Sequence, residues 1–242
     1  MIIETLYEDK DLVVIGKPTG VVVNRAESVK TETIQDWVEA NLTLYLSGTT
    51  PDDDTFIQRS GIVHRIDKET SGLLIISKNQ LAFRALQAQF KERTVHKTYI
   101  ALVHDKISVD EGQINAPIER SPFNRQKFMA SASGKASITR YKVLAHYELG
   151  KQIYCLIEVY PKTGRTHQIR VHFKHFGNVL VSDQKYAGRK RYKKDIVWCP
   201  RLFLHAARIQ FTQPANHKVI TVEQKLPEDL QKALAKLNKY DL

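Results

Sequence analysis

The sequence is poor in cysteine: Cys155 and Cys199 are the two among 242 residues. They do not form a CxxC pair, and Cys155 lies in an alternating, strand-like run. A disulfide framework or a thiolate metal site is therefore not indicated, and both thiols are predicted to be reduced. Reduced thiols fit a cytoplasmic protein.

Export signals and long apolar runs are also lacking. Glu4, Glu8, Asp9 and Asp11 stand where a signal peptide would need a basic and then an apolar segment. No apolar run approaches the roughly 20 residues that span a bilayer. We therefore expect neither export nor membrane insertion.

Nucleotide and metal motifs fail when they are tested. The HRID segment (64–67) has its aspartate one residue too late for a kinase loop, and SGKAS (133–137) has Met129 where a P-loop requires glycine. His167, His172 and His175 cluster, but without an HExxH motif or a nearby carboxylate. We expect no cofactor and no metal.

Acidic residues are too few to balance the charge. There are 37 Lys and Arg against 26 Asp and Glu, which gives a formal net charge of +11. Such a surface favours a polyanionic partner, above all nucleic acid, because bound phosphates release their counterions. GRKRYKKD (188–195) places five basic residues around Tyr192 and is a candidate RNA contact, with a solvated loop as the alternative.

Hydrophobic periodicity predicts more strands than helices. A hairpin is predicted over 11–23, with further strands at 73–77, 98–103, 137–161, 202–211 and 219–224. Helices are predicted over 33–42, after Asn79, after Thr166 up to Gly177, and over 228–239, and SGTTPDDD (47–54) is predicted to be a loop. Adjacent strand pairs favour an α+β fold with a largely antiparallel mixed sheet and flanking helices. Without repeats or linkers, residues 1–242 are predicted to form one domain, and a monomer is expected.

Three segments carry groups that suggest chemistry. Alternation in an extended backbone points Arg65 and Asp67 to one side, Tyr99 begins a strand, and Arg165 stands before a short helix. Taken singly, each has an ordinary explanation: a surface ion pair worth less than about 1 kcal/mol, a core tyrosine, a solvated arginine. Together they provide a carboxylate, a guanidinium and an aromatic ring. That set suits a flat, uncharged ring carried on a polyanion.

These segments also resemble a known family. GIVHRIDKETSGLLIISKN, HKTYIALV and TGRTHQIRVH are similar to segments of the RluA-type pseudouridine synthases, and the likeness runs in order from about Leu6 to Pro214. The resemblance implies a cofactor-free isomerase that detaches the uracil of chosen uridines in RNA and reattaches it through carbon 5. The target nucleotide would have to leave its stack, which costs a few kcal/mol.

The resemblance assigns roles to three residues. Asp67 matches the family's catalytic aspartate, and whether it acts as a nucleophile or as a base stays open. Arg165 matches the basic residue that pairs with that aspartate and keeps it ionised. Tyr99 matches the aromatic residue that lies against the uracil, where stacking is worth about 1–3 kcal/mol.

Five further residues are expected at the substrate. Leu204 matches an apolar residue near the site. His64 and Arg65 would lie beside the flipped nucleotide, and Gln168 and Arg170 line the helix that follows Arg165.

The sequence departs from the family in places. Gly16 replaces an asparagine, Ile66 a leucine and Gln213 a histidine. Many relatives begin with an S4 RNA-binding domain, for which we expect no room here, so substrate choice would rest on the catalytic domain. The target, rRNA or tRNA, is not decided by the sequence. An RNA-binding assembly factor with little catalytic role is the alternative function.

Overall fold

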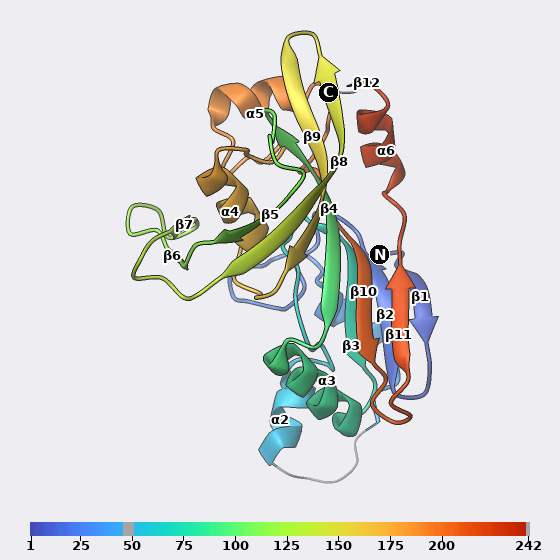
Figure 1. Cartoon of the computed structure of the whole chain (residues 1–242). Coiled ribbons are helices and arrows are strands. Elements are labelled where there is room, and N and C mark those ends of the chain that lie inside the picture. The colour runs from blue at the N-terminus through green and yellow to red at the C-terminus, as the bar shows by residue number, and fades with distance from the viewer. Residues whose placement is uncertain (46–50, 241–242) are drawn as a thin grey trace. The chain divides into compact units, whose positions relative to one another are not determined.

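The computed structural model describes residues 1–45 and 51–240 (Figure 1). The chain divides into two compact units, Met1–Lys97 with Ala206–Gln224 and Thr98–His205 with Lys225–Leu242. Each unit has its own hydrophobic clusters and is described by itself. The prediction of one domain over 1–242 stays a prediction.

The first unit is a sheet flanked by helices. Its strands are β1 (Glu4–Glu8), β2 (Leu12–Lys17), β3 (Ser71–Ser77), β11 (Val219–Glu223) and most of β10 (Leu204–Thr212), in the order β1-β2-β3-β10-β11. The pairs β1–β2, β2–β3 and β10–β11 are antiparallel. Its helices are α1 (Ile34–Asn41), α2 (Pro51–Gln58) and α3 (Gln80–Glu92).

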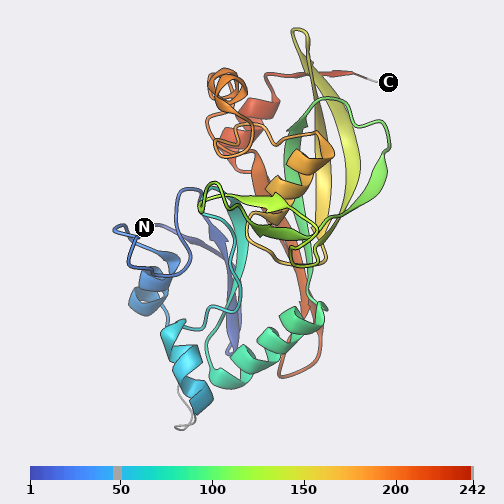
Figure 2. The same cartoon turned by 90° about the vertical axis from the view of Figure 1, so that its left-hand side faces the viewer.

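Strands β2 and β3 are apolar on both faces because both faces are covered. One face is covered by α1 (Figure 2). The cluster on this face includes Val13, Ile15, Ile34, Trp37, Leu74 and Ile76. The other packs with α2 and α3 through Leu12, Val14, Phe56, Leu73, Ile75, Phe83 and Leu86. A strand covered on both sides loses its polar alternation, which is why 73–76 is a continuous apolar run.

The helix ends in this unit follow the sequence. Thr33 caps α1, accepting from the Asp36 N–H while the Asp36 carboxylate accepts from the Thr33 backbone N–H, a reciprocal capping box. Asn79 caps α3 by accepting from the Ala82 N–H at 2.9 Å, as predicted.

The second unit is built on long antiparallel strands. They are β4 (His96–His104), which begins in the first unit, β5 (Glu111–Asn115), β8 (Ile138–Leu149), β9 (Gln152–Pro161) and β12 (Asn238–Tyr240). β4 pairs with β9, β9 with β8, and β8 with both β5 and β12. A small hairpin of β6 (Ile118–Arg120) and β7 (Phe128–Ala130) stands apart from them, and α4 (Gln168–Phe176), α5 (Arg189–Asp195) and α6 (Glu228–Leu234) complete the unit.

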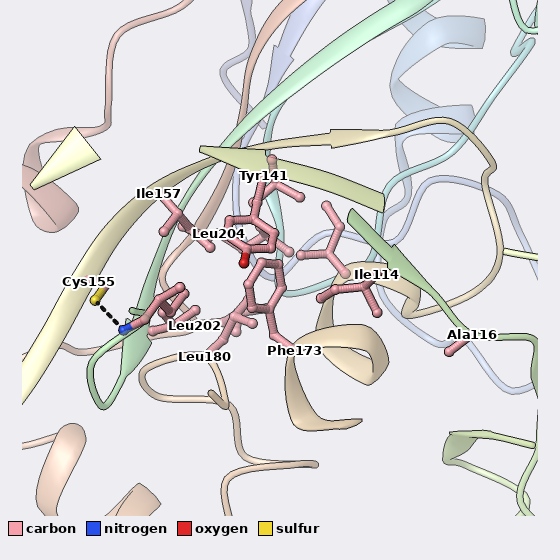
Figure 3. Packing of buried hydrophobic residues seen from close by; sticks show 14 residues of the cluster. Ile114, Ala116, Tyr141, Cys155, Ile157, Phe173, Leu180, Leu202 and Leu204 are labelled. Atoms are coloured by element: carbon pink, nitrogen blue, oxygen red, sulfur yellow. Dashed lines mark hydrogen bonds between the residues drawn. The ribbon is translucent and has the colours of Figure 1, made fainter. Parts of the chain in front are cut away.

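Among the described residues, three hydrophobic clusters lie in this unit. In one, side chains of β4, β8 and β9 meet Phe173 of α4 and Leu180, Leu202 and Leu204 (Figure 3). The Cys155 thiol lies at its edge and accepts from the Ile107 N–H at 3.3 Å. Burial raises the pKa of both cysteine thiols, that of Cys199 to about 11, which disfavours the reactive thiolate form. The α+β class with a mostly antiparallel sheet is confirmed.

Several element predictions were wrong in detail. No strand forms at 20–23, because the Val22 and Val23 carbonyls accept from the first N–H groups of α1. Pro51 begins helix α2, so the loop prediction is wrong for 51–54. The rest of the predicted loop, 47–50, lies outside the described residues. The 188–195 segment is not a loop but contains helix α5.

Two helix boundaries also differ. His167, not Thr166, is the N-cap of α4, and it makes no side-chain capping bond, whereas Gly177 ends the helix as predicted. Helix α6 ends at Leu234, and Asn238–Tyr240 forms β12 instead. The edge hydrogen bonds of β8 hold that last segment extended, which the apolar pattern of 228–239 did not reveal.

Candidate active site

The segment that carries Asp67 lies beside β3. Its backbone is tied to that strand by Gly61, whose carbonyl accepts from both the N–H and the hydroxyl of Ser77 at 2.9 Å. Ile66 is buried, Asp67 is partly buried and Arg65 is exposed. Ile66 is thus more buried than either of its neighbours.

The backbone just after Asp67 forms a turn that the start of the chain holds in place. The Thr70 N–H donates to the Asp67 carbonyl at 3.1 Å. The Lys68 carbonyl accepts from the Gly20 N–H at 2.8 Å and from the Lys17 ammonium at 3.3 Å, and the Glu69 carbonyl accepts from the Thr19 hydroxyl at 2.8 Å.

Lys17 is the residue of this network that the sequence reasoning missed. Its side chain is 1% exposed, and its ammonium also donates to the Pro18 and Val21 carbonyls at 2.8 Å. A buried ammonium requires such acceptors, so the 17–21 loop and the Asp67 turn are built around one cation. The only sequence signal was a lysine before proline at the end of an apolar strand.

His64 has a defined place in the first unit. Its Nε2 accepts from the Ile75 N–H at 2.9 Å, and its ring stacks on Phe90 with centroids 4.6 Å apart. Burial, and then the positive charge of Lys97, lower the pKa of His64 to about 3. The imidazole is therefore neutral at physiological pH.

Gly72 lets β3 approach β10 closely. Its φ is +119°, and a Cβ at this position would lie 2.3 Å from the Ala206 carbonyl oxygen. Any side chain would push the strands apart directly behind the Asp67 turn.

In the second unit, Tyr99 and Leu204 come together. Tyr99 lies on β4 opposite Val159 and packs against the cluster that contains Leu204 and Ile169. Tyr99 is partly buried and Leu204 is 3% exposed. The tyrosine ring thus stands at the border of a packed apolar surface.

Arg165 and Gln168 come together at the start of α4. The Gln168 side chain is buried, and its Oε1 accepts from the Arg165 N–H at 3.0 Å and from the Thr163 hydroxyl at 2.7 Å. Its Nε2 donates to the Ile138 carbonyl and the Thr139 hydroxyl, each at 3.0 Å. Gln168 therefore fixes the backbone from which the exposed Arg165 side chain projects.

Arg170 forms a buried ion pair with Asp183. Its Nε and Nη2 donate to the two carboxylate oxygens of Asp183 at 2.8 Å, and the side chains are 1% and 0% exposed. Asp183 also accepts from the Lys185 and Tyr186 N–H groups at 3.0 and 3.1 Å. This bidentate pair joins α4 to the turn at 183–186.

The eight predicted residues thus fall into two sets. His64, Arg65 and Asp67 lie on one segment of the first unit, and Tyr99, Arg165, Gln168, Arg170 and Leu204 lie in the second. The pairing of Asp67 with Arg165 stays a prediction.

Two exposed features of the second unit suit RNA. Helix α5 exposes four basic side chains to solvent: Arg189, Lys190, Lys193 and Lys194. Buried Asp195 anchors the end of this helix, because its carboxylate accepts from the Ser182 N–H at 3.0 Å and lies 2.9 Å from His104 Nε2. The loop between β6 and β7 exposes 93% of Phe123 near Arg120, Arg125 and Lys127, a feature the sequence reasoning did not single out. An aromatic ring among cations is a stacking surface for unpaired bases.

His172, a buried histidine of α4, is held by ordinary hydrogen bonds. His172 uses both ring nitrogens, at 2.8 Å to the Thr139 hydroxyl and 2.9 Å to the Ala116 carbonyl, and burial lowers its pKa. Within residues 1–45 and 51–240, no group of three or more His, Cys, Asp or Glu side chains could hold a metal ion. Over the same residues, no helix is long and apolar enough to cross a membrane.

Comparisons with known proteins define the class. Residues 11–175 match the model of the RNA pseudouridylate synthase family. An uncharacterized RNA pseudouridine synthase of Bacillus subtilis is 39% identical over 99% of this chain and 74% of its own length. The ribosomal large subunit pseudouridine synthase D of Buchnera aphidicola is 37% identical over 97% of this chain and 73% of its own length.

The fold agrees with the sequence match. The structure of human RNA pseudouridylate synthase domain containing 1 superimposes with a TM-score of 0.75 at 25% identity, over 100% of this chain and 90% of that one. The protein is therefore an isomerase of the class that converts uridine to pseudouridine in RNA. It belongs to the RNA pseudouridylate synthase family, as the RluA-type resemblance implied.

Proposed function

We propose that this chain isomerises specific uridines in rRNA or tRNA to pseudouridine, without a cofactor and with Asp67 as the essential carboxylate. The observation that carries the proposal is the turn at 67–70, which is held by Lys17, Thr19 and Gly20 inside the segment that matches the family. An acidic residue on a backbone turn held in this way, in an otherwise basic protein, suits catalysis better than simple RNA binding.

In this proposal the bond from C1′ of the ribose to N1 of uracil breaks, the ring turns, and a bond forms from C1′ to carbon 5. The proton leaves carbon 5, and N1 gains one. Asp67 acts at the sugar or the base, and Tyr99 lies against the uracil and assists the proton's departure. Arg165 is the basic residue that the family resemblance pairs with Asp67, and a charge-assisted pair of this kind is stronger than a neutral hydrogen bond.

The structure supports refined roles for two residues predicted to contact substrate. Gln168 makes four hydrogen bonds to its own unit, and Arg170 is buried against Asp183. We assign both as positioning residues that orient the α4 start and Arg165. His64, held by Ile75 and Phe90, positions the Asp67 segment, and exposed Arg65 contacts the RNA.

The test is tritium release from RNA labelled at carbon 5 of uracil, comparing wild type with Asp67→Asn. Glu92→Gln, an exposed carboxylate in the same unit, is the matched control. We expect release by wild type and by the control, and none by Asp67→Asn, which should still bind RNA. Binding without release by any of the three proteins would instead favour an RNA-binding assembly factor.

A further inference from the structure

The loop between β6 and β7, residues 121–127, presents the ring of Phe123 to solvent. This side chain is 93% exposed, and among the described residues Ile2, beside the N-terminus, is the one large hydrophobic residue that is more exposed. Single exposed apolar residues are common and require no special explanation. Phe123 differs from them because the backbone that carries it is fixed and because basic residues flank it.

Hydrogen bonds close this loop on itself. The Ser121 N–H donates to the Lys127 carbonyl at 2.9 Å, and the Lys127 N–H donates to the Asn124 carbonyl at 2.8 Å. Nη1 of Arg120 donates to the Arg125 carbonyl at 2.6 Å. A side chain on a backbone held in this way loses little conformational freedom when it binds a partner.

A second set of contacts anchors the hairpin of β6 and β7 to the start of α4. The Tyr186 hydroxyl accepts from the Phe128 N–H at 3.0 Å and lies 2.8 Å from His167 Nδ1. The rings of Phe128 and His167 meet edge to face, with centroids 5.6 Å apart. His167 follows Arg165 by two residues. One hydroxyl therefore joins the hairpin that carries Phe123 to the segment that carries the arginine predicted to act in catalysis, and both belong to the second unit.

The residues around Phe123 fit a partner that is both anionic and flat. Segment 120–128 contains Arg120, Arg125 and Lys127 and no acidic residue, and Arg125 is exposed. Basic side chains of this kind bind phosphates, and an aromatic ring offers a face on which a base can stack. A base inside a double helix has both faces covered by its neighbours, so the ring requires an unpaired base.

We propose that Phe123 stacks on an unpaired base of the RNA that carries the target uridine, an inference that rests on the proposed function. Arg125 and Lys127 bind the phosphates next to that base. Because Tyr186 ties the hairpin to the start of α4, the contact favours substrates that offer a second unpaired base besides the target uridine itself.

Binding is measured in the Asp67→Asn background, so that turnover does not change the RNA. Phe123→Leu keeps an apolar side chain but removes the flat ring, and Phe123→Tyr keeps the ring. Val109→Ala is the control, because Val109 is a 61% exposed apolar residue of the same unit that precedes two acidic residues. The probes are a short, unstructured single-stranded RNA and a strand of equal length built from abasic tetrahydrofuran units, which keeps the phosphates and lacks the bases.

We expect Phe123→Leu to bind the RNA about tenfold more weakly, which lies within the range for the loss of one stacked base. The salt dependence should not change, because no charge is removed. Phe123→Tyr and Val109→Ala should bind as the parent does, and all four proteins should bind the abasic strand alike. An equal loss on the abasic strand would overturn the proposal. Equal affinities of Phe123→Leu and the parent for the RNA would also overturn it and would favour a protein partner for this ring.

Fluorescence reports the stacking directly. The two tryptophans of the chain, Trp37 and Trp198, are buried, so Phe123→Trp adds an exposed fluorophore at the position of the ring. We expect the RNA to quench this emission and the abasic strand to leave it unchanged, and Val109→Trp should respond to neither. Unchanged emission of Phe123→Trp when the protein is saturated with RNA would reject the stacking. Tritium release by the wild type tests the proposed isomerase separately, so failure of one does not imply failure of the other.

Discussion

The imidazole Nε2 of His64 accepts a hydrogen bond of 2.9 Å from the backbone N–H of Ile75. This bond ties the segment that leads to Asp67 to the middle of β3, and it requires a neutral ring. Protonation would turn the acceptor into a donor facing another donor. The low pKa of His64 favours the neutral ring that this hydrogen bond requires.

Acid should destabilise the protein partly through His64. The pKa of His64 is about 3 in the folded protein, against about 6.5 when unfolded, so between these values the unfolded state binds more protons. Stability should fall as the pH drops through that window, by at most about 1.4 kcal/mol per pH unit. His64→Gln keeps an acceptor but cannot titrate. In urea unfolding from pH 7 to pH 4, the variant should lose less stability than wild type, and parallel curves would contradict this role.

Lys17→Met should reduce kcat more than it changes KM. It removes the donor to the Pro18, Val21 and Lys68 carbonyls and loosens the turn after Asp67. We expect at least a tenfold loss, about 1.4 kcal/mol of transition-state stabilisation. Thr19→Val, which removes one hydrogen bond to the same turn, should cost less. Steady-state tritium release gives kcat and KM for each variant. An effect on KM alone would argue against a positioning role for Lys17.

Arg170→Ala should be among the more destabilising single substitutions. It leaves the Asp183 carboxylate buried without its ion-pair partner, a change that typically costs about 3–5 kcal/mol. Arg165→Ala removes an exposed arginine five residues earlier and should change stability by less than about 0.5 kcal/mol. The urea midpoints of the two variants provide the comparison, and similar midpoints would show that the Arg170–Asp183 pair contributes little.

Charge reversal on α5 should weaken RNA binding in a salt-dependent manner. The targets are the four exposed cations Arg189, Lys190, Lys193 and Lys194; Arg191 is left intact because it pairs with Asp105 at 3.3 Å. Removing one cation–phosphate interaction should lower the log–log salt slope by about 0.7–0.9. Reversing four exposed lysines of the first unit, Lys10, Lys30, Lys91 and Lys218, keeps the net charge equal and serves as the control. Equal slopes in the two variants would make α5 a solvated helix.

Local patterns in the sequence were enough to predict most strands, the cap at Asn79, the α+β class and the family. Caps and strand periodicity depend on neighbouring residues, so they are readable from short segments. The apolar run at 73–76 and the HRID segment before it were likewise correctly taken as a buried strand with a polar approach.

Tertiary contacts decided the rest, because the partners lie far apart in the chain. The 20–23 segment became a scaffold for Lys17 and α1 rather than a strand, and Asn238–Tyr240 became a strand because β8 offered an open edge. The sequence shows where the basic side chains are, but not which of them have hydrogen-bond or ion-pair partners in the folded protein. Only the folded chain distinguishes Arg170, which is buried in an ion pair with Asp183, from Arg165, whose side chain is exposed.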